Sequence, residues 1–132
     1  MKRSGFSMIE LVFVIVIMGI LAAVAVPKMM GTSDRAKVSR CEAFYDSMNK
    51  SVSPSLWLAM IQESADASSA YDEANITKMI TIPEGCGSMG DVSKIASDST
   101  HKYDVTIGDL KYEVNGTIAE SSAAAQWDFH KK

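Results

Sequence analysis

One stretch limits what this chain can fold into more than any other. Residues 6–26 form an almost unbroken apolar run, preceded at residues 1–5 by Met-Lys-Arg-Ser-Gly. As a helix, these 21 residues measure roughly 31 Å at about 1.5 Å per residue, enough to cross the hydrocarbon core of a bilayer. Glu10 is the one charged residue in the run, and an ionised group at mid-bilayer costs about 2.5–3.5 kcal/mol on insertion scales. Glu10 therefore needs a physical reason to be there.

An ordinary secretory signal would explain part of this pattern, because Ala23-Val24-Ala25 imitates a small-x-small cleavage site. Such signals have an apolar core of about 7–15 residues, which is shorter than this run. The residues that follow also continue as an amphipathic helix. We therefore favour a retained membrane helix.

The charges that flank the run do not settle its orientation. Basic residues lie on both sides, and counted alone the positive-inside rule would place the C-terminal part in the cytoplasm. The flanking residues are Lys2 and Arg3 before the run, and Lys28, Arg35, Lys37 and Arg40 after it.

Residues 27–132 are enough for one domain with a modest core. The net charge of the chain is −3, from 13 basic and 16 acidic residues. No basic run is long enough to follow a phosphate backbone, so we expect no nucleic-acid partner.

Two residues should weaken the N-terminal helix. Pro27 cannot donate a backbone hydrogen bond, and Gly19 lies inside the apolar run. Helical spacing of apolar residues resumes beyond Gly31. That stripe comprises Val38, Cys41, Phe44, Tyr45, Met48 and Val52. Ser53-Pro54 then reads as an N-cap followed by proline at the first position of a second helix, to about residue 64.

Residues 64–75 are small, polar and acidic, which favours a surface connection, with helix near 71–79 left open. Residues 83–90 hold four turn-forming glycines and prolines and predict a loop.

The period of apolar residues changes to two in the C-terminal third. Residues 103–107 and 110–114 alternate around Gly108-Asp109, which has type II′ turn character. This register pairs Ile107 with Leu110 and puts all six apolar residues of the hairpin on one face. Asn115-Gly116 predicts a second turn, with a three-residue loop that opposes Val114 to Ile118. Residues 123–129 would add a short edge strand. The predicted fold class is α+β, with a long N-terminal helix packed on a small antiparallel sheet.

The N-terminal residues resemble the type IV pilin family, which includes the pseudopilins of type II secretion. The resemblance covers about a quarter of the chain. It rests on Gly5-Phe6-Ser7-Met8-Ile9-Glu10-Leu11, on the run from Gly19 to Pro27, and on the basic amphipathic continuation. It implies a leader at 1–5, a membrane and polymerisation helix at 6–26, and an amphipathic helix with an α+β extracytoplasmic domain at 27–132.

The resemblance also implies roles for single residues. A prepilin peptidase would cut between Gly5 and Phe6 and the new amine of Phe6 would be methylated. The carboxylate of Glu10 would meet the amino terminus of a neighbouring subunit during assembly, and Gly19 and Pro27 would mark a partly unwound segment of the assembled helix. The protein would be held in the inner membrane with its domain outside the cytoplasm. Its expected partners are membrane lipid, an inner-membrane assembly platform and other pilin-like subunits.

Cys41 and Cys86 are the only cysteines. Outside the cytoplasm they predict a disulfide that ties the glycine-rich loop to the long helix; one buried and one free thiol stays the alternative. Many pilins place their disulfide around a C-terminal loop, and this sequence departs from that pattern.

The sequence predicts no metal site or cofactor. The resemblance implies that calcium should be considered, because major pseudopilins of type II secretion bind it near their C-terminus, but the aspartates of this chain do not have the spacing of a calcium loop. These are Asp91, Asp98, Asp104 and Asp109. His101 and His130 have no ligand-type residue at metal spacing, and no serine elbow is present.

The sequence therefore predicts a structural, non-enzymatic subunit of a type IV pilus or a type II secretion pseudopilus. The alternative is a signal-anchored extracytoplasmic binding protein that does not polymerise.

Overall fold

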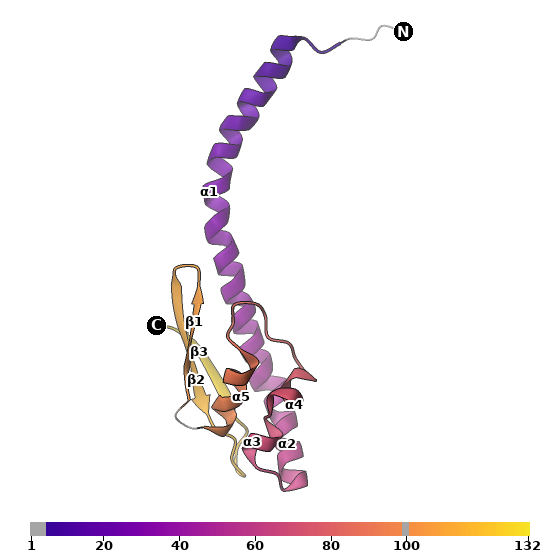
Figure 1. The fold of residues 1–132 in the computed structure, drawn as a ribbon, viewed down its shortest axis with the longest axis vertical. Coiled ribbons are helices and arrows are strands. Elements are labelled where there is room, and N and C mark those ends of the chain that lie inside the picture. The colour runs from indigo at the N-terminus through magenta and orange to yellow at the C-terminus, as the bar shows by residue number, and fades with distance from the viewer. Residues whose placement is uncertain (1–4, 99–100) are drawn as a thin grey trace. The chain divides into compact units, whose positions relative to one another are not determined.

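The computed structural model describes residues 5–98 and 101–132, without the side chains of residues 27–30. The chain divides into two compact units, Met1–Arg35 and Ala36–Lys132. Helix α1 is long, Met8–Ser47, and a π-helical turn follows at Met48–Val52. The other elements are α2 (Ser53–Glu63), α3 (Ala67–Ala70), α4 (Glu73–Thr77), α5 (Met89–Ser97), β1 (Tyr103–Ile107), β2 (Leu110–Thr117) and β3 (Gln126–Lys131) (Figure 1). This confirms the predicted α+β class.

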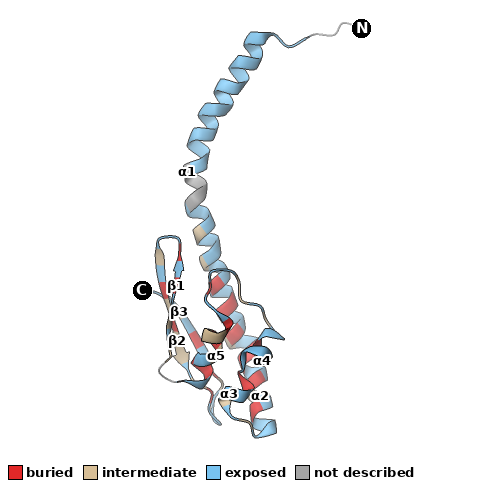
Figure 2. Ribbon diagram, viewed as in Figure 1, coloured by how far each residue is buried: buried red, intermediate tan, exposed pale blue. Residues whose placement is uncertain are grey.

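The predicted stripe on the long helix forms one side of the domain core. Val38 is half-buried, and the five other members are buried. They belong to one apolar cluster with the inward residues of the sheet, and the ring of Tyr45 stacks on Phe129 of β3 at 5.3 Å between centroids. Buried residues concentrate in this second unit (Figure 2).

The predicted cap at Ser53 is wrong. The helical path runs on from α1 through the π-helical turn into α2, and the N-cap residue of α2 is Val52, which makes no side-chain cap bond. Ser53 is fully buried, and its hydroxyl bonds the carbonyl of Ala125 and the hydroxyl of Tyr71. The backbone is already helical before Ser53, so its side chain serves the core.

The residues between α2 and the sheet are more ordered than predicted. The connection 64–75 holds α3 and the start of α4, with Asp66 and Asp72 as side-chain N-caps. Ser88 caps α5, which begins inside the stretch that was predicted to be a loop. The buried residues of α5 complete the core; they are Met89, Val92, Ile95 and Ala96.

The sheet has the order β1-β2-β3, and both pairs are antiparallel. The hairpin register is confirmed: Ile107 faces Leu110, and Gly108 takes a φ of 59° in the turn. The predicted second turn at Asn115-Gly116 is wrong, because β2 continues through both residues and pairs with β3. Gly116 allows this, since a Cβ there would lie 1.8 Å from the carbonyl oxygen of Gln126. The predicted edge strand is confirmed as β3.

Candidate functional site: the N-terminal helix

The N-terminal helix begins at Met8, two residues later than predicted. The carbonyl of Ser7 accepts hydrogen bonds from the backbone N–H groups of Glu10 at 3.0 Å and Leu11 at 3.2 Å. Gly5, Phe6 and Ser7 precede the helix and are exposed, Phe6 by 79%. Glu10 lies in the first turn of α1, where the unpaired N–H groups of a helix favour a negative charge.

Apolar side chains cover this helix on all sides and are exposed. Met8–Val26 has a mean hydropathy of 2.9, and none of its residues is buried. In the described part of the chain it is the one helix long and apolar enough to cross a membrane. A soluble helix buries one stripe and leaves the rest polar, so this segment requires an apolar surrounding that the chain itself does not provide.

Packing within the described part of the chain does not account for the predicted weak point at Gly19. A Cβ added at Gly19 would have no atom within 4 Å, so the subunit alone does not require a glycine there. The backbone of α1 is helical through residue 27, and the side chain of Pro27 lies outside the description. Unwinding at Gly19 and Pro27 stays a prediction.

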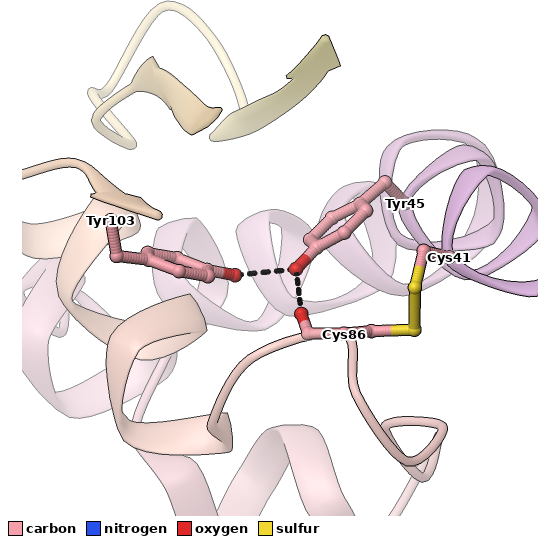
Figure 3. Close-up of a disulfide and its surroundings, with 4 residues drawn as sticks. All are labelled: Cys41, Tyr45, Cys86 and Tyr103. Carbon is pink, nitrogen blue, oxygen red and sulfur yellow. Dashed lines mark hydrogen bonds between the residues drawn. A yellow bond between two sulfur atoms is a disulfide. The ribbon is translucent and has the colours of Figure 1, made fainter. Parts of the chain in front are cut away.

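In the second unit, Cys41 of α1 is bonded to Cys86 in the loop before α5, with Cα atoms 5.3 Å apart (Figure 3). Both residues are fully buried. The hydroxyl of Tyr45 donates to the carbonyl of Cys86 at 2.5 Å and lies 2.6 Å from the hydroxyl of Tyr103. The loop is therefore held to α1 by a covalent bond and by a buried hydrogen-bond pair that sequence analysis missed.

Burial raises the pKa of Tyr45 to about 12; the hydrogen bond with Tyr103 opposes the rise and the charge of Asp91 adds to it. Burial also raises the pKa of Tyr103, and the neighbouring Tyr45 and Asp91 act in the same direction. Both phenols therefore stay neutral to a higher pH than a free tyrosine does, which preserves the hydrogen bonds between them and Cys86.

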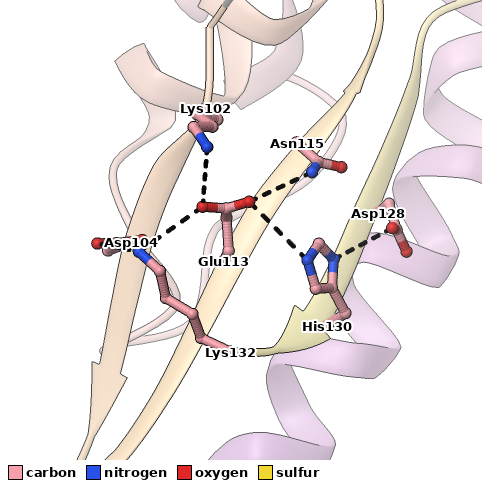
Figure 4. A network of polar contacts seen from close by, with 7 residues as sticks. All are labelled: Lys102, Asp104, Glu113, Asn115, Asp128, His130 and Lys132. Carbon is pink, nitrogen blue, oxygen red and sulfur yellow. Dashed lines mark hydrogen bonds and ion pairs between the residues drawn. The ribbon is translucent and has the colours of Figure 1, made fainter.

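The outer face of the sheet carries a charged network (Figure 4). Glu113 of β2 lies at its centre, with its side chain 13% exposed, 3.3 Å from Lys102, 3.7 Å from Lys132 and 3.9 Å from His130. Lys132 also bonds Asp104 at 2.8 Å, and this hydrogen bond lowers the pKa of that carboxyl. The network connects all three strands, so its evident role is to hold the sheet together.

The aspartates considered for calcium are separated. Asp91 accepts a hydrogen bond from the hydroxyl of Ser88 at the start of α5, Asp104 bonds Lys132, and Asp109 lies in the hairpin turn. Across residues 5–98 and 101–132, no three carboxylate, histidine or cysteine groups come together as a metal site would require.

Comparison with known families finds a match confined to the N-terminus. Residues 1–26 match the family described as the prokaryotic N-terminal methylation motif. No solved structure matches the chain. The segment with the exposed apolar helix is therefore also the segment that carries a recognised motif.

Relatives of two kinds match the chain over stretches of 35–43 residues. The type II secretion system core protein G of Pseudomonas aeruginosa is 53% identical over 38 residues, which are 29% of this chain and 27% of that protein. The core protein G of Klebsiella michiganensis is 56% identical over 35 residues, 26% of this chain and 25% of that protein. The type IV narrow pilus major component PilA5 of Thermus thermophilus is 46% identical over 43 residues, 33% of this chain and 37% of that protein. The matched stretches thus cover only 25–37% of each of these relatives.

Proposed function

We propose that this chain is a structural, non-enzymatic subunit of a helical fibre, either a type IV pilus or a type II secretion pseudopilus. The observation that carries the proposal is the coincidence of the methylation motif at residues 1–26 with a helix that exposes apolar side chains all round and holds one carboxylate. The relatives of the chain include proteins of both kinds, a secretion core protein and a pilus component. The fibre would form through the helix, as the subunit leaves the inner membrane.

Processing would take place before α1. A prepilin peptidase would cut between Gly5 and Phe6, and methylation of the Phe6 amine would follow. Both residues are exposed and precede the first helical residue, Met8, so a peptidase could reach the bond without unwinding a helix. Cleavage would leave a charged amino group four residues from Glu10.

Glu10 would pair with the amino terminus of a neighbouring subunit. A carboxylate and an ammonium group are each costly in an apolar medium, and their pairing offsets part of both costs. Only a subunit docked in the right register satisfies both groups. The pair would therefore select the register of assembly more than it stabilises the monomer.

The disulfide supports an extracytoplasmic domain. Disulfides persist in oxidising compartments and are rare in the cytosol, and Cys41–Cys86 lies in the second unit. This argues against the orientation obtained by counting basic residues. The domain would lie outside the cytoplasm and the leader inside, with an inner-membrane assembly platform as partner.

Crosslinking in cells tests the fibre proposal. Single cysteines placed on the exposed α1 surface of the otherwise wild-type chain, whose own two cysteines are bonded to each other, should give a ladder of multimers when the assembly machinery is present. Glu10→Gln should still be cleaved but give at least about tenfold fewer fibres, because a charge-assisted pair contributes about 1.5–3 kcal/mol. Glu63→Gln, an exposed carboxylate on α2, is the matched control and should assemble normally.

The competing function is a signal-anchored binding protein that works alone. It predicts monomers in every crosslinking lane and equal behaviour of Glu10→Gln and Glu63→Gln. Imaging of shed fibres from cells with and without this protein separates a surface pilus from a secretion pseudopilus.

A further inference from the structure

The asparagines of this chain share a sequence context that fibre assembly does not use. There are three, and each is followed two residues later by serine or threonine with a residue other than proline between. They are Asn49-Lys50-Ser51, Asn75-Ile76-Thr77 and Asn115-Gly116-Thr117. This tripeptide is the acceptor sequence for N-linked glycans on exported proteins. The tripeptide alone is common, so the structure has to separate the three.

Asn49 is committed to the fold through both ends of its carboxamide. Its Nδ2 donates to the carbonyl of Trp127 at 2.8 Å, and its Oδ1 accepts from the N–H of Trp127 at 2.8 Å. The side chain thus occupies the free edge of β3 as a strand would. A glycan on Nδ2 would remove the bond to the carbonyl of Trp127 and would keep Oδ1 too far from the N–H of Trp127 to accept its hydrogen bond.

Asn75 is committed in the same way. Its Nδ2 donates to the carbonyls of Ser69 at 3.1 Å and Ala70 at 3.4 Å, and its Oδ1 accepts from Lys78 at 3.1 Å. These bonds join α4 to the end of α3. A glycan here would break the connection between the two short helices.

Asn115 differs from both. It lies on β2 with Glu113 and Thr117 at a period of two, so the three side chains share the outer face of the sheet while Val114 is buried. Among the described residues, the one hydrogen-bond partner of its Nδ2 is Glu113, at 3.5 Å, which is the outer limit of a hydrogen bond (Figure 4). Thr117 is exposed. Asn115 itself is half-buried on this face, and a substituent on its nitrogen would replace one weak contact.

We propose that Asn115 is the N-glycosylation site of this protein. The inference rests on the proposed function only in placing the domain outside the cytoplasm. The donor is an oligosaccharide joined through its C1 carbon to a lipid diphosphate. A bond forms between Asn115 Nδ2 and C1, the C1–oxygen bond to the diphosphate breaks, the lipid diphosphate leaves with that electron pair, and the amide proton passes to it. Transfer takes place before β2 pairs with β3, because the acceptor tripeptide must be free of the strand ladder to enter a transferase. The folded contacts then act as a filter: a chain modified at Asn49 or Asn75 cannot complete the fold, whereas a chain modified at Asn115 can.

A glycan at Asn115 also implies that the outer face of the sheet is exposed to solvent in the assembled protein. A glycan on Asn115 keeps the outer face of the sheet from packing on a second subunit. In an assembled fibre this face, with the network centred on Glu113, would form the outside.

Mass spectrometry of the protein from its own cells tests the site, because trypsin separates the three asparagines into peptides 41–50, 51–78 and 112–131. We expect a glycan mass on 112–131 and unmodified 41–50 and 51–78. Thr117→Ala should abolish the modification, whereas Thr117→Ser, which preserves the acceptor sequence, should retain it. Both substitutions replace an exposed side chain, so neither should change the fold.

An unmodified 112–131 peptide in mature protein overturns the proposal, and so does a glycan carried by 41–50 or 51–78 instead. A glycan that survives Thr117→Ala overturns it as well. The same spectra report on the proposed function separately, because a chain that retains residues 1–5 and gives no fibres contradicts that function whatever the state of Asn115.

Discussion

Removal of the disulfide should cost the domain a large part of its stability. The bond joins residues 45 apart in sequence, and the loop-entropy relation gives about 13 cal/mol/K for that length, or about 4 kcal/mol at 25 °C. Domains of this size have a free energy of unfolding of about 5–15 kcal/mol. The double variant Cys41→Ala/Cys86→Ala should therefore fold only marginally.

Urea unfolding of the full chain in detergent measures this loss. Trp127 is buried in the core, so its fluorescence reports on the domain. With a urea dependence of about 1–3 kcal/mol/M for small proteins, the midpoint should fall by about 1–4 M. Wild-type protein unfolded under reducing conditions is the matched control, because it lacks the bond but keeps both sulfur atoms in the core.

The comparison separates chain entropy from packing. If the entropy argument holds, reduced wild type should lose most of what the double variant loses, and the difference between them should be the cost of two missing sulfur atoms. A loss below about 1 kcal/mol in both would refute the reasoning. The loop would then be held by its other contacts, above all the bond from Tyr45 to the carbonyl of Cys86.

Three further predictions concern the domain. Tyr45 should make the free energy of unfolding depend on pH above about pH 10, because its folded pKa of about 12 exceeds the ordinary 10.0. That free energy should fall by up to about 2–3 kcal/mol as the pH rises from 10 towards 12, and denaturant titrations of Tyr45→Phe should show a smaller fall. By the same assay, Gly116→Ala should lower the free energy of unfolding by at least about 2 kcal/mol, because the new Cβ would overlap the backbone of β3. Gly90→Ala on α5 is the contrasting variant: its Cβ has room, and the free energy of unfolding should rise by up to about 1 kcal/mol. Asn49→Ala should cost about 2–3 kcal/mol by leaving both backbone groups of Trp127 unpaired, and hydrogen exchange at Trp127 should quicken before exchange elsewhere in the sheet.

The spacing of apolar residues correctly predicted those parts of the fold in which a single helix or hairpin buries one of its faces. The stripe from Val38 to Val52 and the hairpin register both follow from which side chains must be inside, and both agree with the structure. The second turn failed because Asn115-Gly116 has the composition of a turn, yet Gly116 is there to let β3 approach. Close backbone approach between distant segments leaves no local pattern.

Helix α5 was missed for a related reason. Its apolar residues have helical spacing, but the stretch from Gly85 to Gly90 holds three glycines and a cysteine. These turn-forming residues predicted a loop where the helix begins. The disulfide explains why that composition suits the site. Gly85 and Gly87 take φ values of 88° and 105°, which bring Cys86 to Cys41 and leave Ser88 to cap the helix.

The N-terminal segment differs in kind from the rest, because its own fold does not account for Glu10. The free N–H groups at the start of α1 contribute about 0.3–1 kcal/mol to a carboxylate in the first turn. Removal of that carboxylate from water costs several kcal/mol, so the helix terminus offsets only a minor part. The remainder must come from a group outside the chain as folded, either water at a membrane surface or a cation in an apolar assembly. Only the second makes the carboxylate essential, which is why the contrast between Glu10→Gln and Glu63→Gln discriminates a polymerising subunit from a solitary anchor.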